Sequence, residues 1–406
     1  MLSFTRSTCL SLLILLAGGS GAGWAQQHAA GGGYGQLASA GNAFGFKLFR
    51  EIHAQARAGE NIFISPLSVA AALTMVSNGA AGATEVAMRG TLELGALDPA
   101  ETNEGYHRLF ERLEGLDAAV EFLPANSIWY SRDLEVKQAF LDLNREFFGA
   151  EAAAVDFTSP STPPAINVWV RDRTGGRIAD IVDAAIDPAV IMYLINAVYF
   201  NGEWTIQFAE ELTTERPFRL ADGGVKRVSM MTYPGPQQIG RFSDEDYEAI
   251  DLPYGAQAYS MTIVMPAAGA DLEALVASLD PERWQEIVKG LSPTATNVLL
   301  PKFRLAYELE MSDVLKRMGM GIAFSAAAEF SKICDEGVFI SRVKHKAFVD
   351  VREEGTEAAA ATAVELKRGL RPTVLAVDRP FVFVIRERSS GAILFMGRVA
   401  DPTASE

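Results

Sequence analysis

Cysteine is nearly absent from this chain. Among its 406 residues there are two cysteines, Cys9 and Cys334, and Cys9 lies in an N-terminal segment that we expect to be removed. The remaining thiol cannot form an internal disulfide, and a domain of this size can bury enough apolar surface to fold without one. We therefore interpret Cys334 as a small, partly buried side chain rather than a reactive thiol.

Histidine is also scarce, and the common catalytic and metal-binding motifs are missing. The four histidines are His28, His53, His107 and His345. The sequence contains no HExxH, CxxC, GxSxG or GxxxxGK[ST] motif, and no strand is predicted before the glycines at 31–35. We therefore predict no catalytic residue, no metal site and no cofactor. A Ser-His-Asp hydrolase that uses His345 stays open as an alternative, because such triads are spatial arrangements.

Positive charge is in deficit. Lysine and arginine total 36 against 51 aspartate and glutamate residues, which gives a formal net charge of −15 and a pI of about 4.9. This balance argues against sequence-independent binding to nucleic acid or to acidic membranes, because both require an excess of positive charge at the contact.

Long apolar runs are missing except near the N-terminus. The run Leu10–Ala17 follows a single basic residue, Arg6, and precedes small residues that end in "GWA". It is too short to cross a bilayer, and the whole pattern is typical of an export signal cleaved after Ala25. The alternative, a buried helix, is disfavoured by the glycine and serine that follow. We predict a signal peptide at 1–25 and a secreted or periplasmic protein.

The rest of the chain is predicted to be one α+β domain. Residues 26–38 form a Gly-rich, flexible lead-in. From residue 39 to residue 406 helical and strand patterns alternate without a break in composition, with helices frequent early and strands late. The almost wholly apolar segment 190–204, "VIMYLINAVYFNGEW", predicts a strand buried on both faces in the middle of a sheet.

The segment 353–364, "EEGTEAAAATAV", is unusually small and featureless for a packed protein. Taken alone it favours a surface helix, because alanine is the best helix former and Thr356 can serve as an N-cap.

Several motifs occur together and in order, and they carry a resemblance to a known family. They are "NIFISPLSVAAALTMVSNGAAG", "INVWVRDRTGGRI", "INAVYFNGEW", "VSMM", "LPKFRLAYELEMSDVLKRMGM", "ISRVKHKAFVDVREEGTEAAAATA" and "RPFVFVIRERSSGAILFMGRV". From about Asn42 to Pro402 the chain resembles the serpins, inhibitors of serine proteases. The resemblance implies three β-sheets, about nine helices and an exposed reactive loop at about 353–375.

The resemblance gives the small segment a role as the hinge of that loop, which enters the central sheet as a new strand after cleavage. The implied hinge residues are Glu353, Glu354, Gly355, Thr356, Glu357, Ala358, Ala359, Ala360 and Ala361. In a strand, Thr356, Ala358 and Ala360 share one face and Glu357 lies on the other, so only small side chains would meet the core. Gly355 supplies the backbone freedom that a hinge needs.

The function implied by the resemblance is inhibition by a suicide substrate rather than catalysis. A serine protease would cut the loop and be trapped as a covalent acyl-enzyme by a monomeric inhibitor. The alternative is a non-inhibitory serpin that serves in binding or storage. Resemblance also implies no heparin cofactor, because residues 96–120 lack the basic face that heparin-activated members carry.

The scissile bond is expected between Arg368 and Gly369, because arginine suits an acidic specificity pocket. The alternative is the bond between Gly369 and Leu370, where glycine offers no side chain to such a pocket. Lys367 and Arg371 remain open as bait for other trypsin-like enzymes, although the bond after Arg371 faces Pro372.

Five further residues match positions that the family uses where the central sheet opens: Ser65, Ser68, Asn196, His345 and Trp204. A buried polar cluster can hold strands together while staying easier to separate than an apolar core. The alternative interpretation is that all five are ordinary packed core residues.

Overall fold

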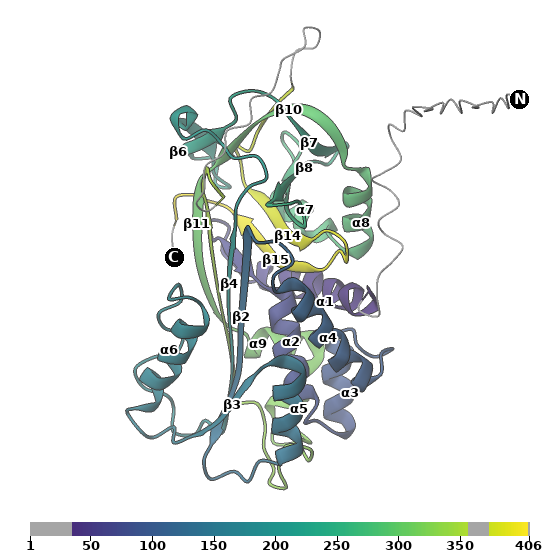
Figure 1. Cartoon of the computed structure of the whole chain (residues 1–406), viewed down its shortest axis with the longest axis vertical. Coiled ribbons are helices and arrows are strands. Elements are labelled where there is room, and N and C mark those ends of the chain that lie inside the picture. The colour runs from purple at the N-terminus through teal and green to yellow at the C-terminus, as the bar shows by residue number, and fades with distance from the viewer. Residues whose placement is uncertain (1–34, 356–372, 405–406) are drawn as a thin grey trace, which may run out of the picture.

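The computed structural model describes residues 35–355 and 373–404 (Figure 1). The helices in these ranges are α1 (Gly35–His53), α2 (Pro66–Ser77), α3 (Gly82–Thr91), α4 (Pro99–Leu113), α5 (Gln138–Phe148), α6 (Thr162–Arg173), α7 (Leu272–Ser278), α8 (Pro281–Gly290) and α9 (Ser312–Leu315). The short 3-10 or π helices in these ranges are η2 (Glu210–Leu212), η3 (Lys316–Met320) and η4 (Gly321–Phe324).

The strands in the described ranges are β1 (Ile62–Ile64), β2 (Val120–Ser131), β3 (Glu151–Val155), β4 (Met192–Gly202), β5 (Thr214–Arg219), β6 (Val225–Thr232), β7 (Gln237–Ser243), β8 (Tyr247–Tyr254), β9 (Tyr259–Pro266), β10 (Ser292–Pro301), β11 (Phe303–Glu310), β12 (Arg342–Val351), β13 (Thr373–Ala376), β14 (Phe381–Glu387) and β15 (Ile393–Val399). This mixture of helices and antiparallel-rich sheets confirms the predicted α+β class.

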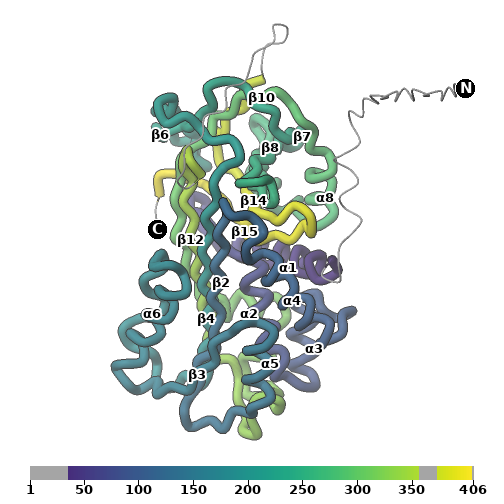
Figure 2. The backbone as a smooth tube through the Cα atoms, in the orientation of Figure 1, coloured from purple at the N-terminus to yellow at the C-terminus, as the bar shows by residue number. Residues whose placement is uncertain are grey.

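A long five-stranded sheet runs along the molecule in the order β11-β12-β4-β2-β3 (Figure 2). β4 lies at its centre, and all but one of the residues Met192–Gly202 are buried. The prediction of a central strand at 190–204 is therefore confirmed, because only a strand covered on both faces tolerates such a continuous apolar run.

The second sheet contains ten strands, and β10 joins its two parts. Residues 292–296 of β10 pair with β7, whereas residues 296–301 pair with β13 and β6. The resemblance implied three sheets, and the described residues form two hydrogen-bonded sheets because this shared strand links the second and third.

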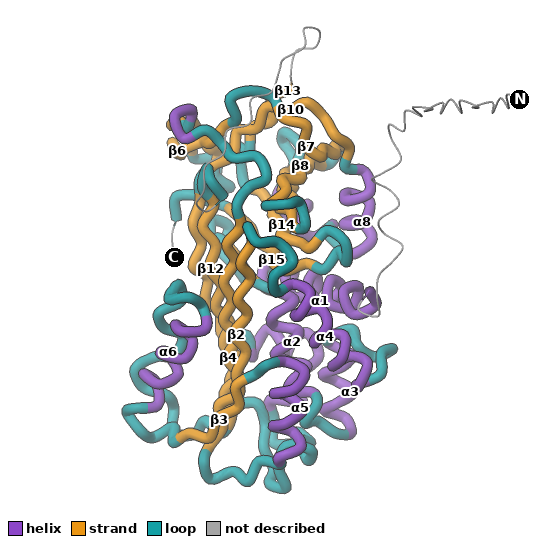
Figure 3. The backbone as a smooth tube through the Cα atoms, viewed as in Figure 1, coloured by secondary structure: helices purple, strands orange, loops and turns teal. Residues whose placement is uncertain are grey.

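Helices cover both faces of the five-stranded sheet, with α6 on one side and α2 on the other (Figure 3). A hydrophobic cluster lies on each face. The larger cluster contains Leu194 and Val198 of β4 together with α2, all twelve residues of which are buried. The smaller cluster contains Ile195 and Ala197 of β4 and packs under α6. Successive residues of one strand thus point to different cores, as the alternation of strand side chains requires.

The helix α1 begins inside the segment that was predicted to be a flexible lead-in. It starts at Gly35, within the Gly-rich lead-in predicted for residues 26–38. Leu37 and Ala38 are buried against the main core, and burial of these two side chains outweighs the low helix propensity of the neighbouring glycine. The predicted signal peptide lies outside the described residues.

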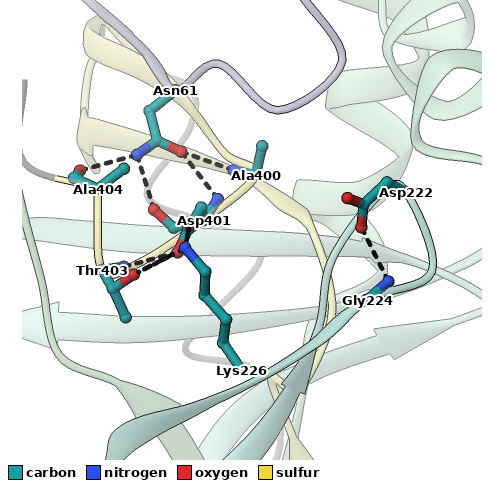
Figure 4. Close-up of polar contacts among 8 residues, drawn as sticks. All are labelled: Asn61, Asp222, Gly224, Lys226, Ala400, Asp401, Thr403 and Ala404. Carbon is teal, nitrogen blue, oxygen red and sulfur yellow. Dashed lines mark hydrogen bonds and ion pairs between the residues drawn. The ribbon is translucent and has the colours of Figure 1, made fainter.

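The C-terminal residues are fastened to the start of β1 by Asn61 (Figure 4). The side-chain oxygen of Asn61 accepts hydrogen bonds from the backbone N–H groups of Ala400 (2.8 Å) and Asp401 (3.0 Å). Its amide nitrogen donates to the carbonyl oxygens of Asp401 (2.8 Å) and Ala404 (3.1 Å). The Asn61 side chain is buried, so these four hydrogen bonds are shielded from water.

We expect Asn61→Ala to lower the free energy of unfolding by about 2–4 kcal/mol, because four hydrogen bonds near 1 kcal/mol each are lost. Thr403→Ala is the control, since it removes the two hydrogen bonds of the Thr403 hydroxyl, with Asp401 and Lys226, and leaves those of Asn61 in place. Urea titrations followed by tryptophan fluorescence measure both. Equal losses in the two variants would contradict the anchoring role of Asn61.

Candidate functional site

The predicted hinge leaves from the end of β12, and the neighbours of β12 decide where it could be inserted. β11 pairs with β12 in antiparallel register through Val351, so that side of β12 is occupied along its length. On the other side β12 pairs in parallel with β4, from Arg342 opposite Tyr193 to Phe348 opposite Tyr199. A segment that turns back after β12 runs antiparallel to both strands. It can therefore gain a ladder only by entering between β4 and β12.

The pair of strands is already open at its upper end. The ladder stops at Phe348 and Tyr199, although β12 continues to Val351 and β4 to Gly202. A small cavity lies in this gap, lined among others by Phe200, Trp204 and Gly355. Two strand ends whose inner edges are not paired with each other thus lie beside the turn at Gly355.

Below the gap, a row of three polar residues crosses the sheet. Asn126 of β2 lies opposite Asn196 of β4, and Asn196 lies opposite His345 of β12. The Asn196 oxygen contacts Nδ1 of His345 (2.5 Å), and its amide nitrogen donates to Oδ1 of Asn126 (2.5 Å). The contact between Asn196 and His345 spans the two strands that insertion would separate.

The start of α2 completes this network from beneath the sheet. The Asn196 amide also donates to Oγ of Ser68 (2.6 Å), and the backbone N–H of Ser65 donates to Nε2 of His345 (3.3 Å). Ser65 caps α2 by accepting from the Ser68 N–H, and its hydroxyl donates to the carbonyl of Leu394 (2.7 Å). Ser65, Ser68, Asn196 and His345 are all buried.

The hydrogen bonds fix the protonation of His345. Because Nε2 accepts from the Ser65 N–H, the proton of the neutral ring lies on Nδ1 and is donated to Asn196. Burial lowers the pKa of His345 from its ordinary value of 6.5 to about 3, so the ring is neutral near pH 7. The Ser65 hydroxyl faces Leu394 rather than the ring, and this geometry offers no support for a hydrolase built on His345.

Trp204 lies apart from the polar network, at the upper end of the sheet. Its indole nitrogen donates to the carbonyl of Arg352 (2.9 Å), and its ring stacks on Tyr254 with 4.2 Å between centroids. Its backbone N–H donates to the carbonyl of Glu354 (3.2 Å). Trp204 therefore holds the turn that connects β12 to the hinge.

Glu353 is buried in this turn and is fully partnered. Its carboxylate accepts from the hydroxyl of Thr213 (2.6 Å) and forms an ion pair with Lys302 (2.7 Å). Burial opposes ionisation, but the hydrogen bonds from Lys302 and Thr213 outweigh it, and the pKa of Glu353 lies below its ordinary value. The backbone carbonyl also accepts from the Phe208 N–H (2.9 Å). The base of the predicted hinge is therefore clamped.

Gly355 occupies a place that no other residue fits. Its φ angle is +81°, and a Cβ atom there would come within 2.2 Å of the Trp204 nitrogen and 2.4 Å of the Gly202 carbonyl oxygen. Both are backbone atoms of the chain that continues from β4, so they cannot move aside cheaply. The glycine lets the chain pass directly over the open end of β4.

The structure thus brings four of the five predicted sheet-opening residues into one network and places the fifth, Trp204, beside the hinge. Sequence reasoning missed Asn126, Thr213, Lys302 and Tyr254, which complete these contacts. Of the predicted hinge, Glu353, Glu354 and Gly355 are described. Outside the described residues lie Thr356, Glu357, Ala358, Ala359, Ala360 and Ala361, and the predicted scissile residues Arg368, Gly369 and Leu370.

Among residues 35–355 and 373–404, no three histidine, cysteine or acidic side chains gather as a metal-ion site. In the same part of the chain, no helix combines the length and the apolar character that a membrane span requires.

Comparison with known proteins connects this geometry to a family. The model of the family "Serpin (serine protease inhibitor)" matches residues 39–402. The chain is similar to the leukocyte elastase inhibitor of Sus scrofa, with 35% identity over 383 residues that cover 90% of this chain and 100% of that protein. It is 33% identical over 404 residues to Iripin-2 of Ixodes ricinus, covering 97% and 98% of the two chains.

A solved structure of human thyroxine-binding globulin in complex with thyroxine is similar as well. It superimposes with a TM-score of 0.84 and 27% sequence identity, over 92% of this chain and 100% of that chain.

The buried neutral His345 predicts acid sensitivity. Because its folded-state pKa is depressed, its contribution to stability is complete above about pH 6.5 and falls by about 1.4 kcal/mol per pH unit as the pH drops toward 3. We expect His345→Gln to flatten the pH dependence of the unfolding free energy between pH 6.5 and 5, measured by urea titration. His107→Gln, at a half-exposed position on α4, is the control. A slope that stays unchanged in His345→Gln would overturn the assignment.

Proposed function

The chain belongs to the serpin family, and from this premise we propose that it is a secreted inhibitor that traps trypsin-like serine proteases as a suicide substrate. The family alone leaves the choice open. The proteins that are similar to this chain include an elastase inhibitor and a thyroxine-binding globulin. The proposal therefore rests on the hinge and on the strands beside it.

The observation that carries the proposal is the unfinished ladder between β4 and β12. Three residues at the end of each strand lie beyond the last registered pair, directly beside the turn at Gly355. A returning segment could begin to pair there before any existing hydrogen bond breaks. Each further step exchanges the parallel β4–β12 ladder for two antiparallel ladders, which are slightly more stable per residue.

The hinge sequence meets the requirements of that exchange. In strand geometry Thr356, Ala358 and Ala360 would face the larger core, beside the row that contains His345 and Asn196. Small side chains avoid the strain of filling a site without a prepared cavity. About a dozen inserted residues, at roughly 1 kcal/mol of net hydrogen bonding each, would supply on the order of 10 kcal/mol.

The chemical step belongs to the protease. Its serine would attack the carbonyl carbon of Arg368, and the amine of Gly369 would leave as the acyl-enzyme ester forms. Insertion of the cut loop would then carry the tethered enzyme along the sheet and distort its active site before water can hydrolyse the ester. The bond between Gly369 and Leu370 is the alternative. The chain contributes the bait and the driving force, and no catalysis.

The remaining parts of the proposal concern location and partners. We propose export by residues 1–25 and action as a monomer without heparin. The face of α4 supports the absence of heparin binding, because Arg108 is paired with Glu104 and Arg112 lies beside Glu387.

Incubation of the purified protein with trypsin, chymotrypsin, elastase and subtilisin tests the proposal. A complex that survives SDS, strongest with trypsin, is the expected outcome. Cleavage without a stable complex would favour a non-inhibitory binding protein instead, and turnover of a test ester would indicate a hydrolase. Mass spectrometry of the released C-terminal peptide identifies the bond that is cut.

Thr356→Arg should convert the inhibitor into a substrate, because a buried guanidinium on the inward face of an inserted strand costs several kcal/mol. Glu357→Arg is the matched control, since its side chain would stay on the other face. The ratio of inhibitor cleaved to complex formed, read from SDS gels, should rise several-fold only for Thr356→Arg. Equal ratios in both variants would contradict the proposed strand parity.

A further inference from the structure

A cavity lies between three helical elements, away from the strands that would part. It has a volume of about 520 Å³ and is lined by α1, by α3 with the turn that follows it, and by η3. α1 and α3 lie on the side of the five-stranded sheet that α2 covers (Figure 1). The described residues that line the cavity include none from β4 or β12.

Ion pairs and hydrogen bonds hold the walls of this cavity in place. Lys47 of α1 forms an ion pair with Glu93, in the turn after α3. One helical turn farther along α1, Glu51 accepts a hydrogen bond from Nε of Arg317 in η3 (2.6 Å). η3 packs against α3 as well. Each wall is thus attached to its neighbours, so the hollow is formed before any ligand arrives, and this lowers the entropic cost of binding.

Two glycines leave the space between these walls unfilled. Gly90 of α3 lines the cavity, and a Cβ atom built there would meet no atom within 4 Å. Gly319 of η3 also lines it, and its φ angle of +112° is one that other residues rarely adopt. A Cβ atom at Gly319 would contact only the hydroxyl oxygen of Thr91, at 3.4 Å. A larger side chain at Gly90 would therefore occupy the cavity.

One cation in the wall has no acidic partner. Arg50 lines the cavity and lies between Lys47 and Glu51 on the same face of α1. Its Nη1 donates to the carbonyl of Leu279 (2.7 Å), which anchors the side chain. Within residues 35–355 and 373–404 no carboxylate pairs with this guanidinium, whereas Lys47 and Glu51 are both paired. Arg50 is therefore the surplus charge of the wall.

The other walls of the cavity supply apolar surface. Val86 and Ala87 of α3 and Met318 of η3 line it. Val86 is 73% exposed, the largest fraction among the exposed large hydrophobic residues of the described ranges. A single exposed valine is ordinary on a protein surface, but beside a cavity it offers apolar surface for a ligand to cover. Apolar walls with one charged group are the common form of a small-molecule site.

From these observations we propose that the cavity binds a compact organic monocarboxylate. Its apolar body covers Val86 and Met318, and its carboxylate accepts a charge-assisted hydrogen bond from Arg50. An inorganic anion would leave the apolar walls bare, and an organic cation would meet the unpaired guanidinium. The volume of about 520 Å³ lies within the range of small-molecule sites. This proposal does not rest on the inhibitory function, because the cavity contains no residue of the hinge or of the sheet-opening network.

Two rigid probes with the same hydrocarbon body and opposite charge test the proposal: adamantane-1-carboxylate and 1-adamantylammonium. Calorimetric titration of the purified full chain, at neutral pH and physiological ionic strength, should show a single site for the carboxylate. The carboxylate should bind at least about tenfold more tightly than the ammonium, because only the carboxylate can accept from a guanidinium. Equal binding of the two probes, or no binding of the carboxylate at millimolar concentration, would overturn the proposal.

Gly90→Leu tests the location of the site. The leucine side chain should enter the cavity and reduce the affinity for the carboxylate at least about tenfold, while α3 gains a better helix former. Gly41→Leu on α1 is the matched control. A Cβ atom at Gly41 also meets no atom within 4 Å, but this glycine lies outside the cavity, so the affinity should stay within twofold. Equal effects of the two substitutions would contradict the assigned location.

Arg50→Gln tests the charge. It should weaken binding of the carboxylate at least about tenfold and abolish the preference over the ammonium. Arg108→Gln on α4 is the control, because it removes an arginine that is paired with Glu104, and it should change neither affinity by more than twofold. Should Arg50→Gln fold poorly, Val86→Asp at its exposed position should weaken the carboxylate and strengthen the ammonium. A preference for the carboxylate that survives these substitutions would overturn the proposal.

Discussion

The contact between Asn196 and His345 is the interaction on which the rest of this structure depends. It joins the two strands of a parallel pair at their centre, and it is polar where the surrounding core is apolar. Every member of the row is partnered, so the closed sheet carries no orphaned group there. Separation of β4 and β12 would have to break this polar contact together with the ladder between the two strands. A sheet closed in this way can be stable and still be able to open.

The upper end of the same pair complements this arrangement. Trp204, Glu353 and Gly355 hold the turn after β12 against the end of β4, beside the gap in the ladder. The lower part of the sheet is covered by α6 on one face and α2 on the other. The upper end is where the two strands are already unpaired, beyond Phe348 and Tyr199.

Much of this fold could be predicted from sequence because its signals are local. The apolar run that forms β4 and the Ser-Pro pair at the start of α2 can each be recognised from a few neighbouring residues. The partners Asn126 and Lys302 could not be found in that way, because each depends on the register between strands far apart in the chain. The motif that begins at Leu300, "LPKFRLAYELE", likewise hides a change of sheet between β10 and β11, at Pro301 and Lys302. The serpin resemblance supplied the long-range order that periodicity alone lacks.

The hairpin of β14 and β15 has a consequence for the molecule after it has been cut. Both strands lie inside the ten-stranded sheet, between β1 and β9, and every one of their residues is buried. A break anywhere in residues 356–372 would leave this C-terminal portion with no covalent link to the remainder. It would nonetheless persist as the small subunit of a two-chain protein, held by ladders on both sides and by Asn61. The ladders and Asn61, rather than the covalent link through residues 356–372, therefore hold this portion in the architecture.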